Sequence, residues 1–175
     1  MEQHFNTPSE VIDTNMKAGE GKAHLPLGKM ILLGIMAGAF IALGGATSST
    51  AAHAIDNVGL ARFVAGIIFP VGLMIIVFVG GELFTGNCLM VMALLERRIT
   101  PAQLLRNWLT VYLGNAMGGA AVAALAVYSH TASLFGDGLA RSMVSIAESK
   151  AALGAGDAFL RGVLCNFLVC LAVWM

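Results

Sequence analysis

The stretch that decides the fold is Gly80-Gly81-Glu82-Leu83-Phe84-Thr85-Gly86-Asn87, which lies inside an apolar run from residue 63 to residue 95. A continuous membrane helix has no need of three glycines, a glutamate, a threonine and an asparagine within eight residues. Irregular backbone at membrane depth is tolerated only where it is buried in protein or lines a cavity, and broken helices mark transport sites. The stretch therefore predicts a break in a membrane-spanning helix, with both half-helix ends facing a permeation path.

The composition indicates an integral membrane protein. The 175 residues are 58% hydrophobic and only 11% charged, and the mean hydropathy is +0.82, whereas soluble domains carry about 25% charged residues. The net charge of zero gives no indication of nucleic-acid binding. Cys88, Cys165 and Cys170 all lie in apolar runs, and their spacing fits neither a metal site nor a redox pair. We therefore expect no metal, no cofactor and no enzymatic activity.

Long charge-free runs predict an all-α, polytopic fold, because a span needs about 20 apolar residues. Basic residues near residues 17–29 and 97–106 place these segments on the cytoplasmic side of a plasma or inner membrane. The alternative for the first residues is a disordered tail. The chain is predicted to consist of a cytoplasmic amphipathic segment at 1–29 and a transmembrane domain at 30–175. The transmembrane domain has spans at about 30–55, 63–95 (broken) and 101–128. An outer loop at 129–157 and the first part of a fourth span at about 158–175 follow.

Small residues and prolines predict how the spans pack. Gly34-xxx-Gly38 and the glycines around Asn115 allow close contact between membrane helices, and Asn115 itself is an interhelical hydrogen bonder. Pro70 is expected to kink the second span. Residues 56–62 are expected to form a short outer loop. Thr100 before Pro101 predicts the start of the third helix.

The last residues suggest that the chain stops inside a helix. Residues 163–175 are apolar or weakly polar and fewer than a full span needs, so we expect a fragment of a longer protein. The sequence of residues 32–36 is also similar to that of residues 160–164, and the two predicted spans that contain them cross the membrane in opposite directions. A repeat of opposite orientation is typical of inverted-repeat transporters.

Three stretches resemble the formate/nitrite transporter family. They are Gly81-Glu82-Leu83-Phe84-Thr85-Gly86-Asn87, Leu113-Gly114-Asn115, and Cys165-Asn166-Phe167-Leu168-Val169-Cys170-Leu171-Ala172-Val173-Trp174-Met175. The resemblance implies an aquaporin-like protomer with six spans, a pore in each protomer of a homopentamer, and transport of a small monovalent anion: formate, nitrite or hydrosulfide. Formate is the first choice, and the direction of transport stays open.

The resemblance also implies roles for single residues. It assigns the hydrophobic pore constrictions to Phe69, Leu73 and Phe84. It places Lys150 at the outer vestibule, where it attracts anions, with Asn166 close by.

In the family, the threonine that matches Thr85 hydrogen-bonds a central histidine of the fifth span. That span lies outside this sequence, and none of the four histidines present replaces its histidine; they are His4, His24, His53 and His130.

The residues of the break support such a path on physical grounds. The half-helix after Asn87 is expected to offer a positive N-terminal end to an anion. A dry constriction disfavours a bare charge, so a weak acid that is protonated in passage fits better than chloride. Glu82 is interpreted as a carboxylate that holds the break in shape through bonds to loop N–H groups.

Three alternatives remain. A water or neutral-solute pore of aquaporin type is disfavoured because the chain has no Asn-Pro pair. A membrane anchor or enzyme subunit is disfavoured because no paired histidines or cysteine cluster are present for a cofactor. The third alternative is a non-conducting truncated fragment.

Overall fold

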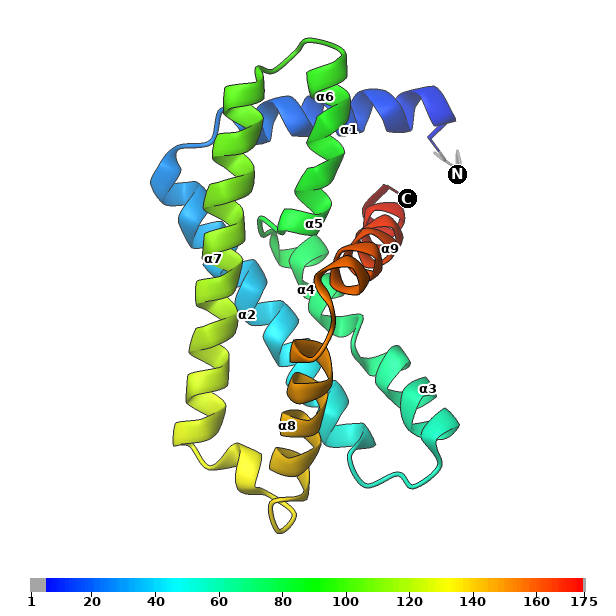
Figure 1. The fold of residues 1–175 in the computed structure, drawn as a ribbon. Helices are drawn as coiled ribbons and strands as arrows, with labels where there is room; N and C mark the ends of the chain where they lie inside the picture. Colours follow the sequence, from blue (N-terminus) through cyan, green and yellow to red (C-terminus); the bar gives the residue numbers. More distant parts are fainter. Residues whose placement is uncertain (1–5, 175) are drawn as a thin grey trace, which may run out of the picture.

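The computed structural model describes residues 6–174 and confirms the all-α prediction, since every element it assigns there is a helix (Figure 1). Residues 1–5 of the predicted N-terminal segment and Met175 of the last motif lie outside this range. The α-helices are α1 (Pro8–Ala23), α2 (Leu27–Ala52), α3 (Val58–Ile68), α4 (Val71–Val79), α5 (Phe84–Asn87), α6 (Val91–Leu95), α7 (Pro101–Tyr128), α8 (Gly138–Ala151) and α9 (Ala155–Trp174); the 3₁₀ turns are η1 (Cys88–Met90) and η2 (Thr131–Ser133).

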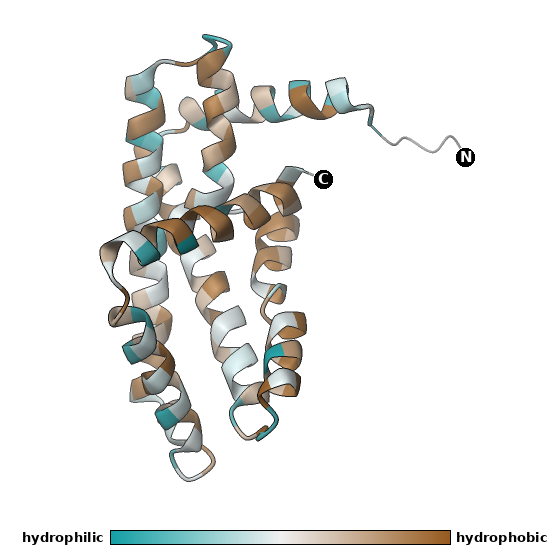
Figure 2. Ribbon diagram, turned by 45° about the vertical axis from the view of Figure 1, so that its right-hand side comes forward, coloured by the Kyte–Doolittle hydropathy of each residue, from teal (hydrophilic) through white to brown (hydrophobic). Residues whose placement is uncertain are grey.

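Within residues 6–174, four helical segments are long and apolar enough to cross a membrane: α2, α3 with α4, α7 and α9. Figure 2 shows hydrophobic residues along these segments and hydrophilic ones in the connections at their ends. α9 was expected to begin at residue 158 as a partial span, but it starts at Ala155 and has 20 residues. Asp157 in its first turn favours this earlier start, because a carboxylate there interacts well with the helix dipole.

The central contact is between α2 and α7; in Figure 1, α2 passes behind α7 at an angle, and the two helices diverge towards their C-terminal ends. A Cβ on Gly38 would lie 2.6 Å from the Cα atom of Asn115, and one on Gly118 would lie 2.7 Å from the backbone nitrogen of Ala39. Both distances are too short for a side chain. The glycines therefore let the two backbones touch, as the small-residue pattern predicted.

Helix α1 lies across one end of the bundle, beside α6 (Figure 1). Thr7 caps it in a capping box with Glu10. Its buried residues are Met16, Gly19 and Ala23, and a Cβ on Gly19 would lie 3.3 Å from the Cβ of Ala93. Helix α1 thus packs against the protein, and the alternative of a disordered tail is wrong for residues 8–23.

The second span is interrupted twice. Pro70 separates α3 from α4, as expected from its missing N–H. The second interruption covers only residues 80–83, because α5 begins at Phe84. Thr85, Gly86 and Asn87, predicted to lie in the break, are instead in this helix. Residues 58–62, predicted as loop, are also helical, because the Asn57 side chain caps α3 by accepting from the Leu60 N–H.

Candidate functional site

The break is stabilised by one side chain from α7. Asn115 Nδ2 donates to the carbonyl oxygens of Gly34 and Glu82, both at 2.8 Å, and its Oδ1 accepts from the Phe84 N–H at 2.9 Å. The Glu82 N–H donates to the Leu33 carbonyl at 3.2 Å. Gly80 has φ +91°, a conformation that L side chains rarely adopt. The N–H and the carbonyl of Glu82 and the N–H of Phe84 thus have partners inside the protein, and the bonds of Asn115 to two other segments confirm the prediction for this residue.

A buried polar cluster continues from the break towards α1; its members are Lys22, Glu82, Asn87 and Asn107. Asn87 Nδ2 donates to Glu82 Oε2 at 2.7 Å and to Asn107 Oδ1 at 2.8 Å. Lys22 Nζ donates to Asn87 Oδ1 at 2.6 Å and lies 3.3 Å from Glu82 Oε1. Glu82 is 5% exposed, and both asparagines are fully buried.

The cluster corrects the interpretation of Glu82. Its carboxylate does hold the break in shape, but its partners are the Asn87 amide and the Lys22 ammonium rather than loop N–H groups. Because Lys22 balances the charge of Glu82, the break presents no uncompensated carboxylate to an anion. The helix N-terminus that was predicted after Asn87 lies earlier in the chain, because the helix restarts at Phe84. The N–H of Phe84 is already bound by Asn115.

Sequence reasoning missed three members of this region. Lys22 was taken only as a charge that marks the cytoplasmic side, and Asn107 was not singled out. The third is Trp108, whose indole N–H donates to the Asn87 carbonyl at 3.0 Å. One signal was present: a carboxylate within an apolar run requires a cationic partner.

The three predicted constriction residues do not line one cavity. Leu73 lines a cavity of about 290 Å³ beside the break, together with Lys22, Gly81, Leu83, Gly86 and Val173. The ring of Phe84 packs edge-on against Trp108 and Tyr112, with ring centroids 5.9 and 5.4 Å away. Phe69 caps the end of α3 and is 46% exposed. Their common role as constrictions stays a prediction.

Thr85 stands out among the described residues. Its Oγ1 is the one buried side-chain nitrogen or oxygen there that has no hydrogen-bond partner. Its carbonyl accepts from the Cys170 thiol of α9 at 3.2 Å. A buried hydroxyl without a partner is costly unless a ligand or another group uses it.

Lys150 and Asn166 lie in different surroundings. Lys150 lines a cavity of about 600 Å³ that also includes Gly162 and Cys165 of α9. Asn166 Oδ1 instead accepts from the Cys170 thiol at 3.7 Å, on the side of α9 that faces Thr85. The structure shows no hydrogen bond between these two residues, and Asn166 does not line the cavity of Lys150.

The sequence is similar to a known transporter family along almost its whole length. The model for the formate/nitrite transporter family matches residues 9–175. A probable formate transporter of Methanothermobacter thermautotrophicus is 37% identical over 194 residues, covering 100% of this chain and 70% of that protein. The formate channel FocA of Haemophilus influenzae is 36% identical over 171 residues, covering 97% of this chain and 60% of that protein.

Two solved structures have a similar fold. An ion channel of the FNT family gives a TM-score of 0.85 at 31% identity, covering 95% of this chain and 68% of the channel. A pentameric formate channel with formate bound gives 0.76 at 30% identity, covering 85% of this chain and 59% of the channel. The chain thus spans between 59% and 70% of the length of these four proteins.

Proposed function

The chain belongs to the formate/nitrite transporter family, and from this premise we propose that the protein carries a small monovalent anion, formate first, across a membrane. Nitrite and hydrosulfide are the alternatives within the same family. The names of the relatives describe channels and transporters, and several specify formate. We further propose a homopentamer in a cell membrane with the N-terminus on the cytoplasmic side, by analogy with the pentameric formate channel.

The observation that carries this proposal is the break at residues 80–83. Asn115 binds the Glu82 carbonyl and the Phe84 N–H, and the ammonium of Lys22 balances the charge of the Glu82 carboxylate. The cavity beside it is lined mainly by apolar residues, with Leu73, Leu83 and Val173 among them. A small anion in the cavity beside the break is thus surrounded mainly by apolar side chains and is not repelled by an unpaired carboxylate.

The apolar wall favours passage of a neutral species. Burying a bare charge is expensive, whereas a weak acid such as formic acid loses its charge by taking up one proton. The unpartnered hydroxyl of Thr85 offers a hydrogen bond at the helix that follows the break. The family resemblance assigns the proton donor to a histidine that pairs with this threonine.

Flux measurements on the purified protein in liposomes test this proposal. We expect uptake of formate that is faster at lower external pH, slower uptake of nitrite or hydrosulfide, and no uptake of chloride above empty liposomes. Nitrite or hydrosulfide uptake faster than formate would select the alternative substrate. Chloride uptake at the rate of formate would contradict passage as a neutral acid.

A further inference from the structure

Two of the three cysteines meet at the contact between α9 and the helix that follows the break. The Cys88 thiol, in η1, donates to the Phe84 carbonyl at 3.5 Å. The Cys170 thiol, in α9, donates to the Thr85 carbonyl at 3.2 Å. These two carbonyls belong to consecutive residues of α5. The thiols therefore bind neighbouring positions of α5, although they belong to different segments of the chain.

Asn166 of α9 connects the two thiols. Its Oδ1 accepts from the Cys170 thiol at 3.7 Å, and its side chain is also a hydrogen-bonding partner of the Cys88 thiol. The two sulfur atoms are close enough for the charge of one thiolate to act on the other. Both cysteines are partly buried, and both are free. The fold thus pairs two thiols whose spacing along the chain gave no indication of a site.

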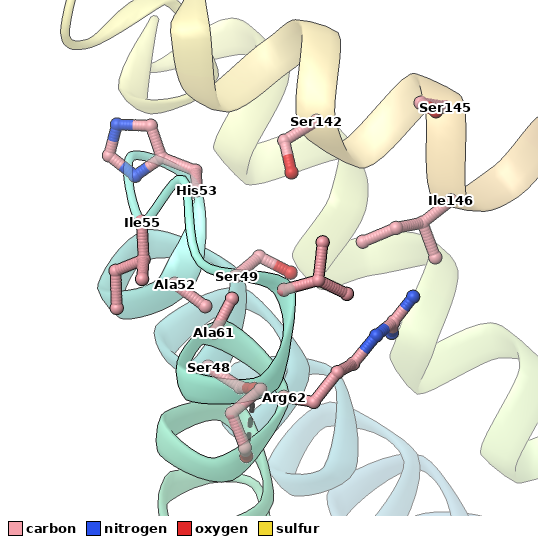
Figure 3. A pocket seen from close by; sticks show the side chains of 12 residues that line it. Ser48, Ser49, Ala52, His53, Ile55, Ala61, Arg62, Ser142, Ser145 and Ile146 are labelled. Atoms are coloured by element: carbon pink, nitrogen blue, oxygen red, sulfur yellow. Dashed lines mark hydrogen bonds between the residues drawn. The ribbon is translucent and has the colours of Figure 1, made fainter.

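The third cysteine lies in different surroundings. Cys165 is exposed on α9 and lines the cavity of Lys150, which shares Arg62 with the serine-rich pocket of Figure 3. Among the described residues, no other cysteine lines either of these two spaces. Cys165 would therefore bind a metal ion through one sulfur, whereas Cys88 and Cys170 can bind one together.

The number and type of the donors decide which ion fits. Within residues 6–174, no group of three or more histidine, cysteine, aspartate or glutamate side chains could hold a metal ion, so a tetrahedral zinc site finds no ligand set there. Thiolates select soft metal ions, and the softest, such as Hg²⁺, are satisfied by two thiolates in a line. Two thiolates also cancel both charges of a divalent ion, which matters in an apolar helix because an unbalanced charge is costly there.

We propose that Cys88 and Cys170 form a binding site for one soft, thiophilic divalent cation, for which Hg²⁺ is the probe. On binding, both S–H bonds break, each sulfur keeps its electron pair and forms a bond to the metal, and two protons pass to the solvent. The bound ion fastens α9 to the segment after the break. Since Thr85 lies in that segment, the ion hinders the passage of formate; this effect rests on the proposed function, whereas the binding itself does not.

The first experiment measures the metal retained by the detergent-solubilised protein. The unchanged protein, Cys88→Ser, Cys170→Ser and Cys165→Ser are each loaded with Hg²⁺ and washed with a monothiol at about 0.01 mM, well below the millimolar effective concentration that a second, linked ligand provides. We expect the unchanged protein and the control Cys165→Ser to retain one mercury per chain, and Cys88→Ser and Cys170→Ser to lose it. Serine keeps a donor for the same carbonyls, so both variants should fold.

Mass spectrometry of the dissociated chain tests the proton balance. The complex should have the mass of one chain with one mercury added and two hydrogens lost. Loss of only one hydrogen, or a mercury shared between two chains, would contradict the site. The proposal is also wrong if Cys165→Ser loses the metal, or if Cys88→Ser and Cys170→Ser retain it as well as the unchanged protein does.

The second experiment compares formate influx into liposomes before and after addition of Hg²⁺. Influx should fall for the unchanged protein and Cys165→Ser, and stay the same for Cys88→Ser and Cys170→Ser. Metal retention with undiminished influx, or inhibition that persists in both of these variants, would refute the effect on passage. A protein that retains one mercury per chain but shows no influx at all would keep the site and refute the proposed function.

Discussion

At the scale of single residues, the pair of Lys22 and Glu82 gives the sharpest prediction about stability. Lys22→Met leaves a nearly buried carboxylate without its cation. Because Lys22 is itself partly exposed, we expect a loss of about 2 kcal/mol in the free energy of unfolding, below the range for fully buried pairs. Lys22→Met/Glu82→Gln should lose less than Lys22→Met alone, since the unpaired charge is then gone.

Thermal or denaturant unfolding of the detergent-solubilised variants measures this difference. Lys17→Met is the control, because Lys17 is an exposed lysine of the same helix. A Lys22→Met protein as stable as Lys17→Met would show that the ion pair contributes nothing.

The same scale shows what the sequence can reveal about a side chain. Asn115 was predicted to bond between helices because an amide in an apolar helix has few other partners. Its partners could not be predicted, since they are backbone atoms 81 and 33 residues away. The Lys22–Glu82 pair was missed for a related reason: the charge pattern placed Lys22 on the cytoplasmic surface, and only the packing of α1 against α6 brings it to the break.

At the scale of helices, the contact of α2 with α7 predicts a sharp difference between two neighbouring glycines. A Cβ at position 118 would collide with the backbone of Ile35 and Ala39, whereas one at position 119 meets nothing within 4 Å. Gly118→Ala should therefore cost about 1–3 kcal/mol through overpacking, and Gly119→Ala should be neutral or slightly stabilising. Equal unfolding midpoints for the two variants would show that the backbones are not in contact.

Helix boundaries were predictable where the signal is local. Thr100 caps α7 as expected, because its side chain and that of Gln103 bind each other's backbone N–H groups. The end of the break was placed too late because Gly86 and Asn87 are residues typical of loops. The helix nevertheless restarts at Phe84, where the N–H is bound by Asn115 from another helix, a contact that local sequence does not encode.

At the scale of the whole molecule, the two ends differ in their chemistry. The end beside α1 holds the neutralised cluster of Lys22 and Glu82, and the other holds the cavity with Arg62, Lys150 and Arg161. The number and order of the spans followed from hydropathy, because the bilayer sets their length. Hydropathy did not predict which side chains of neighbouring spans are in contact, since apolar helices of this kind can pack in several ways. The inverted repeat suggested by residues 32–36 and 160–164 stays a prediction.

The central claim is that the helix after the break lines the path of the anion, and formate flux through Thr85→Val tests it most directly. Valine keeps the shape of threonine and removes the hydroxyl that has no partner among the described residues. Stability should be unchanged or rise by about 1 kcal/mol, because an unsatisfied buried group is lost. The account predicts that formate influx nevertheless falls by about tenfold or more, as the loss of one hydrogen bond to the passing formate or formic acid implies. A Thr85→Val protein that is stable and carries formate at the original rate would contradict it.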